Sequence, residues 1–419
     1  MKTIQVNVMT TDHHLNNFID LDSETMDELS KTADELLEVE HLDFDNTNYL
    51  VKALFCLGRY DESIKQFERM LSLKSDNKEI MTNIGINYFK MQDYENAIKY
   101  FSESLENDPD NETALSYKML SYEFLMDYPK AIDCGERILK KNSKNTSVIN
   151  HLIDCHLKLK NYDVCYYYIN RADYKDLYKK ASILYESKRY EECIKTSVKL
   201  KTAESYHLTG KAHHKLGNTI KAVKYLFKSY EKNPNIDILF EISDIYFEVW
   251  DYPRSIHFLK MVLAHDETNV KAYNQIASAY LNSSKWYDAV EYAEKTLEIS
   301  KKVPQAYITL AEAYFQIHGG DFEKSKQIID EGISENPNSA KLWAQKGGYY
   351  YCDESYAFSK AYEKAISLSP SDCSIYREYI YLLLLNEDDD IAKKVYNQML
   401  LMNPLYEKSF EELKKSMFL

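Results

Sequence analysis

The sequence of 419 residues is poor in the residues that break or turn a polypeptide, with only 10 Gly and 8 Pro. A fold built from many short strands needs turn residues at close intervals, so this composition argues against an all-β architecture. The seven Cys are scattered and form no CxxC pair, which argues against a disulfide framework or a zinc knuckle. We expect reduced, mostly buried thiols.

Long apolar runs are missing as well. No stretch of about 18 apolar residues is present to span a bilayer, and the first residues, MKTIQVNVMTTDHH, lack the apolar core of a signal peptide. These absences predict a soluble, cytoplasmic protein without membrane insertion, and a nuclear location fits the same observations.

Signatures of catalysis and metal binding are absent too. The sequence has no Gly-rich phosphate loop, no GxSxG and no HExxH motif. His207 and His214 share one helical face, but a third ligand is missing and the intervening Lys211 disfavours a cation. The Asp12-His13-His14 cluster has no supporting ligands. We therefore predict no enzyme, no catalytic residue, no metal site and no cofactor.

A small residue recurs through the chain at a fixed interval. Ser63, Ala97, Ala131 and Cys165 follow one another at steps of 34 residues. The same place is held farther on by Cys193, Ala222, Ser255, Ala289, Ser325 and Ala392. Tyr is unusually frequent, at 37 residues, and often stands three residues before the small one. A period near 34 with two amphipathic segments per period predicts stacked helix pairs.

The stretch from Gly85 to Pro109 shows what one period requires. Gly85 and Ala97 are small where two helices cross closely, Tyr88 and Phe101 fill the space beside them, and Pro109 cannot continue the second helix. The arrangement resembles the tetratricopeptide repeat (TPR), and a second close match consists of Trp343, Gly347, Tyr350, Ala365 and Pro370.

The resemblance implies an all-α fold, a right-handed α-solenoid or superhelix of about eleven helix-turn-helix units closed by a C-terminal capping helix. We expect three parts: an acidic, partly disordered N-terminal segment with one amphipathic helix at 1–43, the solenoid at 44–405 and the capping helix at 406–419. The expected units start near 44, 78, 112, 146, 174, 203, 236, 270, 304, 340 and 373.

Charge is distributed unevenly along the chain, whose net formal charge is −14. Residues 140–232 carry 20 Lys or Arg against 9 acids, whereas residues 1–47 carry 2 Lys against 12 acids. The basic middle (residues 140–232) suits an acidic or phosphorylated partner segment. The alternative is that its Lys residues form a solvated surface without a specific ligand.

In TPR proteins the first helix of each unit lines a concave groove, so the resemblance implies which residues face a partner. The candidate positions are Asn48, Lys52, Asn83, Lys90, Asn150, Asp154, Lys158, Lys179, His207, Lys211, His214, Asn274, Ser278 and Asn282. The acidic helix expected within 23–37 either caps the first unit or docks in a basic groove as a built-in competitor.

These observations predict a non-catalytic scaffold or adaptor that binds a peptide or helical segment of a partner protein in its groove. The alternatives are a regulator or secretion-type chaperone with a single ligand and, with less support, an RNA-binding solenoid. A homodimer fits an array of this length. Nucleic acid is not the expected partner, because no more than one or two of the Tyr166–Tyr168 rings could form a stacking platform.

Overall fold

The computed structural model describes residues 23–39, 42–73, 78–171, 175–319, 322–351, 355–404, 406 and 409–417. These residues form 24 α-helices and no strand, which confirms the all-α prediction. The segment that holds Asp12, His13 and His14 lies outside the described residues. The helices are α1 Ser23–Leu37, α2 Phe44–Cys56, α3 Tyr60–Leu73, α4 Lys78–Lys90, α5 Tyr94–Asn107, α6 Glu112–Phe124, α7 Tyr128–Lys141, α8 Thr146–Lys158, α9 Tyr162–Arg171, α10 Leu177–Glu186, α11 Tyr190–Ser197, α12 Ala203–Lys215, α13 Thr219–Lys232, α14 Ile236–Glu248, α15 Tyr252–His265, α16 Val270–Asn282, α17 Trp286–Ile299, α18 Pro304–Ile317, α19 Phe322–Glu335, α20 Ala340–Tyr350, α21 Ser355–Leu368, α22 Cys373–Leu385, α23 Asp389–Met402 and α24 Phe410–Met417.

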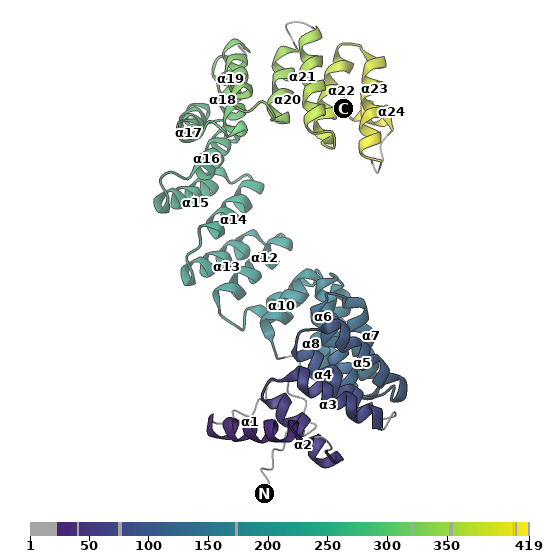
Figure 1. Cartoon of the computed structure of the whole chain (residues 1–419). Helices are drawn as coiled ribbons and strands as arrows, with labels where there is room; N and C mark the ends of the chain where they lie inside the picture. Colours follow the sequence, from purple (N-terminus) through teal and green to yellow (C-terminus); the bar gives the residue numbers. More distant parts are fainter. Residues whose placement is uncertain are drawn as a thin grey trace. The chain divides into compact units, whose positions relative to one another are not determined.

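Helices α2 to α23 form eleven consecutive pairs, and each pair is followed by the next in chain order (Figure 1). In every pair except α10 and α11 the first and second helices pack along each other, and inside each of the two units described next the second helix of a pair packs on the first helix of the following pair. The chain divides into two compact units, residues 1–196 and 197–419. Inside each unit, apolar side chains are shared between neighbouring pairs, which is how a solenoid buries a core without a closed globule.

The turn inside a pair has a constant backbone geometry. Wherever it is described, one residue adopts a positive φ of about 55–75°. That residue is Gly58, Gln92, Met126, Lys160, Lys188, Gly217, Trp250, Ser284, Gly319 or Glu387, in chain order. A left-handed residue at this place ends the first helix, and the tight turn returns the chain antiparallel. Only three of the ten are Gly, so the other turns hold a conformation that costs about 1 kcal/mol each.

Small residues allow the paired helices to approach. All ten members of the periodic series that begins at Ser63 are completely buried. A Cβ added at Gly85 would lie 2.6 Å from Cε1 of Phe101, so the close approach there is to an aromatic ring of α5. The ring of Phe101 therefore fills the space that Gly85 leaves open. At Gly210 the added carbon would meet both Leu226 and the carbonyl oxygen of Ala222.

Aromatic rings, many of them from Tyr, join the two helices of a pair at residues twelve apart. In α4 and α5 the rings of Tyr88 and Tyr100 stack with centroids 5.4 Å apart and an interplanar angle of 14°. Equivalent pairs are His156 with Tyr168, His213 with Tyr225, Tyr246 with Phe258, and Tyr280 with Tyr292. Tyr suits such an interface between helices, because its ring can pack while its hydroxyl keeps a polar partner.

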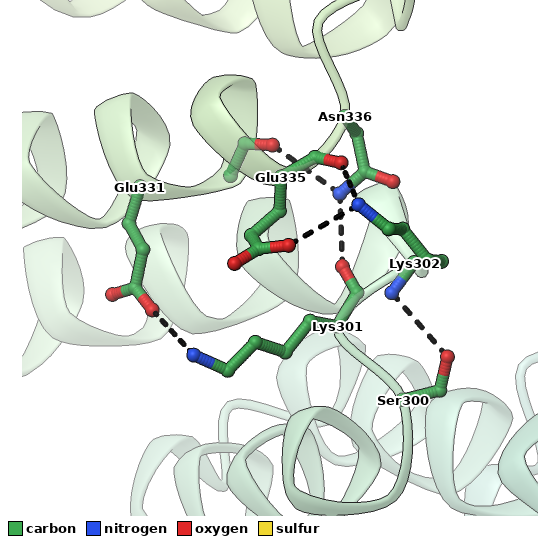
Figure 2. A network of polar contacts seen from close by, with 7 residues as sticks. Ser300, Lys301, Lys302, Glu331, Glu335 and Asn336 are labelled. Atoms are coloured by element: carbon green, nitrogen blue, oxygen red, sulfur yellow. Dashed lines mark hydrogen bonds and ion pairs between the residues drawn. The ribbon is translucent and has the colours of Figure 1, made fainter.

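Polar contacts join two of the turns between successive pairs beside α19 (Figure 2). Lys302, in the turn before α18, donates from Nζ to the carbonyl oxygen of Glu335 at 2.5 Å and to its carboxylate at 3.2 Å. Asn336 Nδ2 donates to the carbonyl oxygen of Lys301 at 2.9 Å. A cation at the carbonyl end of α19 also interacts favourably with the helix dipole.

The two terminal helices cover the ends of the array. Leu29 and Ala33 of α1 are buried against Leu50 and Leu54 of α2. The apolar stripe of the acidic helix therefore packs on the first pair. At the other end Leu413 of α24 is completely buried among side chains of α22 and α23, as expected of a capping helix.

Candidate partner-binding face

The first helices of neighbouring pairs lie close enough for their side chains to meet, and we call the surface they form the first-helix face. In the unit of residues 1–196, His151 of α8 lies 3.1 Å from the carboxylate of Glu123 on α6, and this hydrogen bond raises the pKa of His151. Asp154 of α8 forms an ion pair with Lys179 of α10. Polar side chains therefore link the first helices α6, α8 and α10 to one another.

Candidate residues of this unit occupy two different environments. Asn150, Asp154 and Lys158 are exposed and recur every four residues on α8, so they form one stripe. Lys52 of α2 and Asn83 of α4 are half-buried and line a cavity of about 10 Å³, room for about one water molecule. Asn48 on α2 and Lys90 on α4 are also half-buried.

In the unit of residues 197–419 the candidate histidines are paired with carboxylates of the next first helix. His207 Nε2 on α12 lies 2.8 Å from Glu241 Oε2 on α14, and His214 Nε2 lies 3.4 Å from Glu248 Oε2. Both pairs span 34 residues, one repeat period. Lys211 lies between the two histidines on the same helix, and its side chain is half-buried.

The candidates of α16 bond largely to their own helix. Ser278 Oγ donates to the carbonyl oxygen of Asn274 at 3.1 Å, and Asn282 Nδ2 donates to the carbonyl oxygen of Ser278 at 2.7 Å. The Oδ1 atom of Asn274 is buried and has no hydrogen-bond partner within the described chain. The donor groups of Ser278 and Asn282 are thus already used within the helix.

Sequence reasoning missed the acidic members of these pairs. Glu123, Glu241 and Glu248 lie outside the basic middle and were not among the candidates, yet each faces a histidine on the neighbouring first helix. A search for opposite charge one period away would have found Glu241 and Glu248. The paired carboxylates offset part of the positive charge that the first-helix face would otherwise carry.

Two segments of the chain match models of the tetratricopeptide repeat, residues 79–111 and residues 270–303. The first contains α5 and nearly all of α4, and the second contains α16 and α17. The chain therefore contains tetratricopeptide repeats at these two segments. Asn83 and Lys90 lie in the first matched TPR unit, and Asn274, Ser278 and Asn282 lie in the second.

The TPR repeat-containing protein MJ1428 of Methanocaldococcus jannaschii is 26% identical over 255 residues, which are 54% of this chain and 44% of that protein. This TPR chain therefore matches less than half the length of that relative. Among solved structures, the C-terminal part of a TPR repeat-containing protein from Cytophaga hutchinsonii aligns with a TM-score of 0.39 at 18% identity, covering 56% of this chain and 99% of that one. A structure of Naa15/Naa10 bound to HypK-THB aligns with a TM-score of 0.41 at 14% identity, covering 94% of this chain and 68% of that one.

The residues that the structure describes contain no group of three or more His, Cys, Asp or Glu side chains placed to hold a metal ion. His207 and His214 each face a carboxylate on α14. No helix in the described part of the chain combines the length and the apolar character needed to cross a bilayer.

Proposed function

We propose that this TPR protein is a non-catalytic scaffold that binds a segment of a partner protein along its first-helix face. The observation that carries the proposal is the exposed stripe of Asn150, Asp154 and Lys158 on α8. Packing in a repeat array uses the buried positions between units, so exposed polar positions repeated on one face are available for recognition. Backbone groups inside these helices are already paired, so side chains would provide the contacts.

The chemistry of the stripe favours an acidic or phosphorylated segment at its lysine end. Lys158 is exposed, and none of the ion pairs among the described residues includes it. It lies in the basic middle, where 20 basic residues outnumber 9 acidic ones. A carboxylate or phosphate placed against such a Lys gains a charge-assisted hydrogen bond, and the resulting affinity falls with ionic strength.

The proposal can be tested by site-specific photo-crosslinking of the full-length chain in an extract of its source cells. A photoreactive amino acid replaces Asn150 in one variant and Lys140 in a second. Lys140 is exposed on α7, a second helix of the neighbouring pair, and serves as the matched control. We expect one or a few proteins to crosslink from position 150 and not from position 140, through a segment rich in Asp, Glu or phosphorylated residues.

Charge-reversal variants provide an independent test of where the partner binds. Lys158→Glu should weaken binding of the crosslinked partner about tenfold, whereas Lys140→Glu should change it less than twofold. Equal crosslinking from positions 140 and 150 would contradict the proposal. Nucleic acid recovered from position 150, displaced by any polyanion, would favour the RNA-binding alternative. A crosslink to a second copy of the chain would instead identify a homodimer.

A further inference from the structure

A groove lies between α13 and α15, on the face formed by second helices, in the unit of residues 197–419. It has a volume of about 390 Å³. Its apolar floor consists of Val223 and Phe227 from α13 with Phe258 and Met261 from α15. The rings of Phe227 and Phe258 meet edge to face with centroids 6.1 Å apart. None of the first-helix candidates lines this groove.

The walls of the groove are cationic. Lys224 and Lys228 line it from α13 against a single acid, Glu231, and His257 adds a polar ring from α15. The Lys228 ammonium lies over the rings of Tyr206 and Tyr225, 5.5 Å from each centroid, which limits where its charge can sit. Lys224 is exposed and forms no ion pair with any described residue.

The apolar floor continues beyond the groove toward the start of α13. Ile220 lies on the same helical face as Phe227, since seven residues are close to two turns, and its side chain is 84% exposed. From Ile220 to Glu231 the face runs for about 16 Å at 1.5 Å per residue. Ile220 therefore extends the apolar surface of the groove along α13.

We propose that the α13/α15 groove binds an acidic amphipathic helix of a partner protein, independently of the first-helix face. Charge complementarity selects the acidic partner, because the rim carries more positive than negative groups above an apolar floor. The helical form follows from the walls. Both walls are helices with internally paired backbones, so an extended peptide would leave its own N–H and C=O groups unpaired over the floor, whereas a helix satisfies them itself.

The dimensions fit such a ligand. About 16 Å is the length of three helical turns, which place two or three apolar anchors on one face. The volume of the groove lies at the lower end of the range for ligand pockets, about 300–1,000 Å³, and accommodates one or two large side chains. Partner carboxylates on the flanks of that helix would then face Lys224 and His257.

The test uses the full chain and a fluorescein-labelled amphipathic peptide of about 15 residues, with Leu and Phe on one face and Glu on the other. A second peptide keeps the apolar face and carries Lys in place of Glu. Binding is measured by fluorescence anisotropy at about 50 and about 300 mM NaCl. We expect the acidic peptide to bind at least tenfold more tightly than the basic one, and the difference to shrink at the higher salt.

Variants locate the peptide. Lys224→Glu and Ile220→Asp should each weaken binding of the acidic peptide about tenfold. Lys394→Glu is the matched control, because exposed Lys394 follows buried Ala392 on α23 as Lys224 follows buried Ala222 on α13. Circular dichroism checks that each variant folds. Both substitutions are at exposed positions, so little loss of stability is expected.

Several outcomes would overturn the inference: equal affinity for the two peptides, no saturable binding, or equal effects of Lys224→Glu and Lys394→Glu. Weakening by Lys158→Glu with no effect of Lys224→Glu would place the peptide on the first-helix face. That result would overturn this inference while leaving the proposed function standing. Conversely, peptide binding that depends on Lys224 would support the groove even if the crosslinks expected at Asn150 were absent.

Discussion

Two adjacent glycines of α20 should respond in opposite directions to the same substitution. A Cβ added at Gly347 would lie 2.4 Å from Cε2 and 2.6 Å from Cδ2 of Tyr362, whereas a Cβ added at Gly348 would meet only the Tyr362 hydroxyl, at 3.9 Å. Gly347 is buried and Gly348 is exposed. The two positions share a helix, a neighbour and nearly the same backbone conformation, so steric contact is what distinguishes them.

The magnitude follows from whether the Tyr362 ring can move. Tyr362 is 1% exposed and stacks on Tyr379, with centroids 5.1 Å apart and an interplanar angle of 8°. Overpacking of a fixed core costs about 1–3 kcal/mol, while Gly→Ala inside a helix contributes up to about 1 kcal/mol. We therefore expect Gly347→Ala to lower the stability of the α20–α21 pair by about 1–2 kcal/mol and Gly348→Ala to raise it by about 0.5–1 kcal/mol.

Native-state hydrogen exchange of the α20 and α21 amides is the appropriate assay, since a repeat array opens locally and a single global transition would average the effect. The double variant Gly347→Ala with Tyr362→Leu should cost less than the sum of the two single changes, because the leucine removes the ring that clashes. Stabilisation by Gly347→Ala comparable to that by Gly348→Ala would refute the reasoning, because it would mean that the ring moves at no cost.

Two further predictions concern the turns and the buried histidines. Trp250→Gly should stabilise the protein by about 0.5–1 kcal/mol and so raise its melting temperature, because Trp250 has a φ of 62°, which Gly adopts without strain. Trp250 is 79% exposed, so little packing is lost. A lower melting temperature in a thermal scan would show that the indole makes contacts of its own. His156→Tyr should reduce the loss of stability on acidification. Burial lowers the pKa of His156, and both of its ring nitrogens are buried without a hydrogen-bond partner among the described residues. The neutral side chain therefore contributes fully to the stability of the folded state above the ordinary pKa of 6.5, and this contribution is lost as pH falls below that value. His151 acts in the opposite direction. Because its pKa is raised in the folded state, its contribution to stability is complete at low pH and is lost as pH rises. Urea titrations of wild type and the His156→Tyr variant at pH 7.5 and 5.5 measure the free energy of unfolding of each protein. An equal difference between the two proteins at both pH values would contradict the prediction.

Residues with a packing role were predictable from sequence because their spacing repeats. The periodic series from Ser63 to Ala392 marks positions where two helices touch, and the touching requires small, buried residues. The left-handed turn residues were not predictable from residue type. Gln92, Met126 and Trp250 hold a conformation that sequence statistics assign to Gly, because the packed helices on either side determine the path of the turn.

The environment of the candidate binding residues was less predictable from the sequence. Placement on the first helix was inferred from the TPR resemblance, but the state of each side chain depends on the next unit. Lys179 and His207 were expected to face a partner, and each faces a carboxylate on a neighbouring first helix, Asp154 and Glu241 respectively. Such pairing depends on two helices meeting in space. Whether these positions contact a partner stays a prediction.

The division into residues 1–196 and 197–419 has a spectroscopic consequence. The three tryptophans, Trp250, Trp286 and Trp343, all belong to the second unit, while tyrosines are present in both. Emission excited at the red edge of the indole band therefore reports residues 197–419 alone, and tyrosine absorbance reports the whole chain. Following both signals through one denaturant titration would show whether the two units lose their structure together, without a label or a truncated protein.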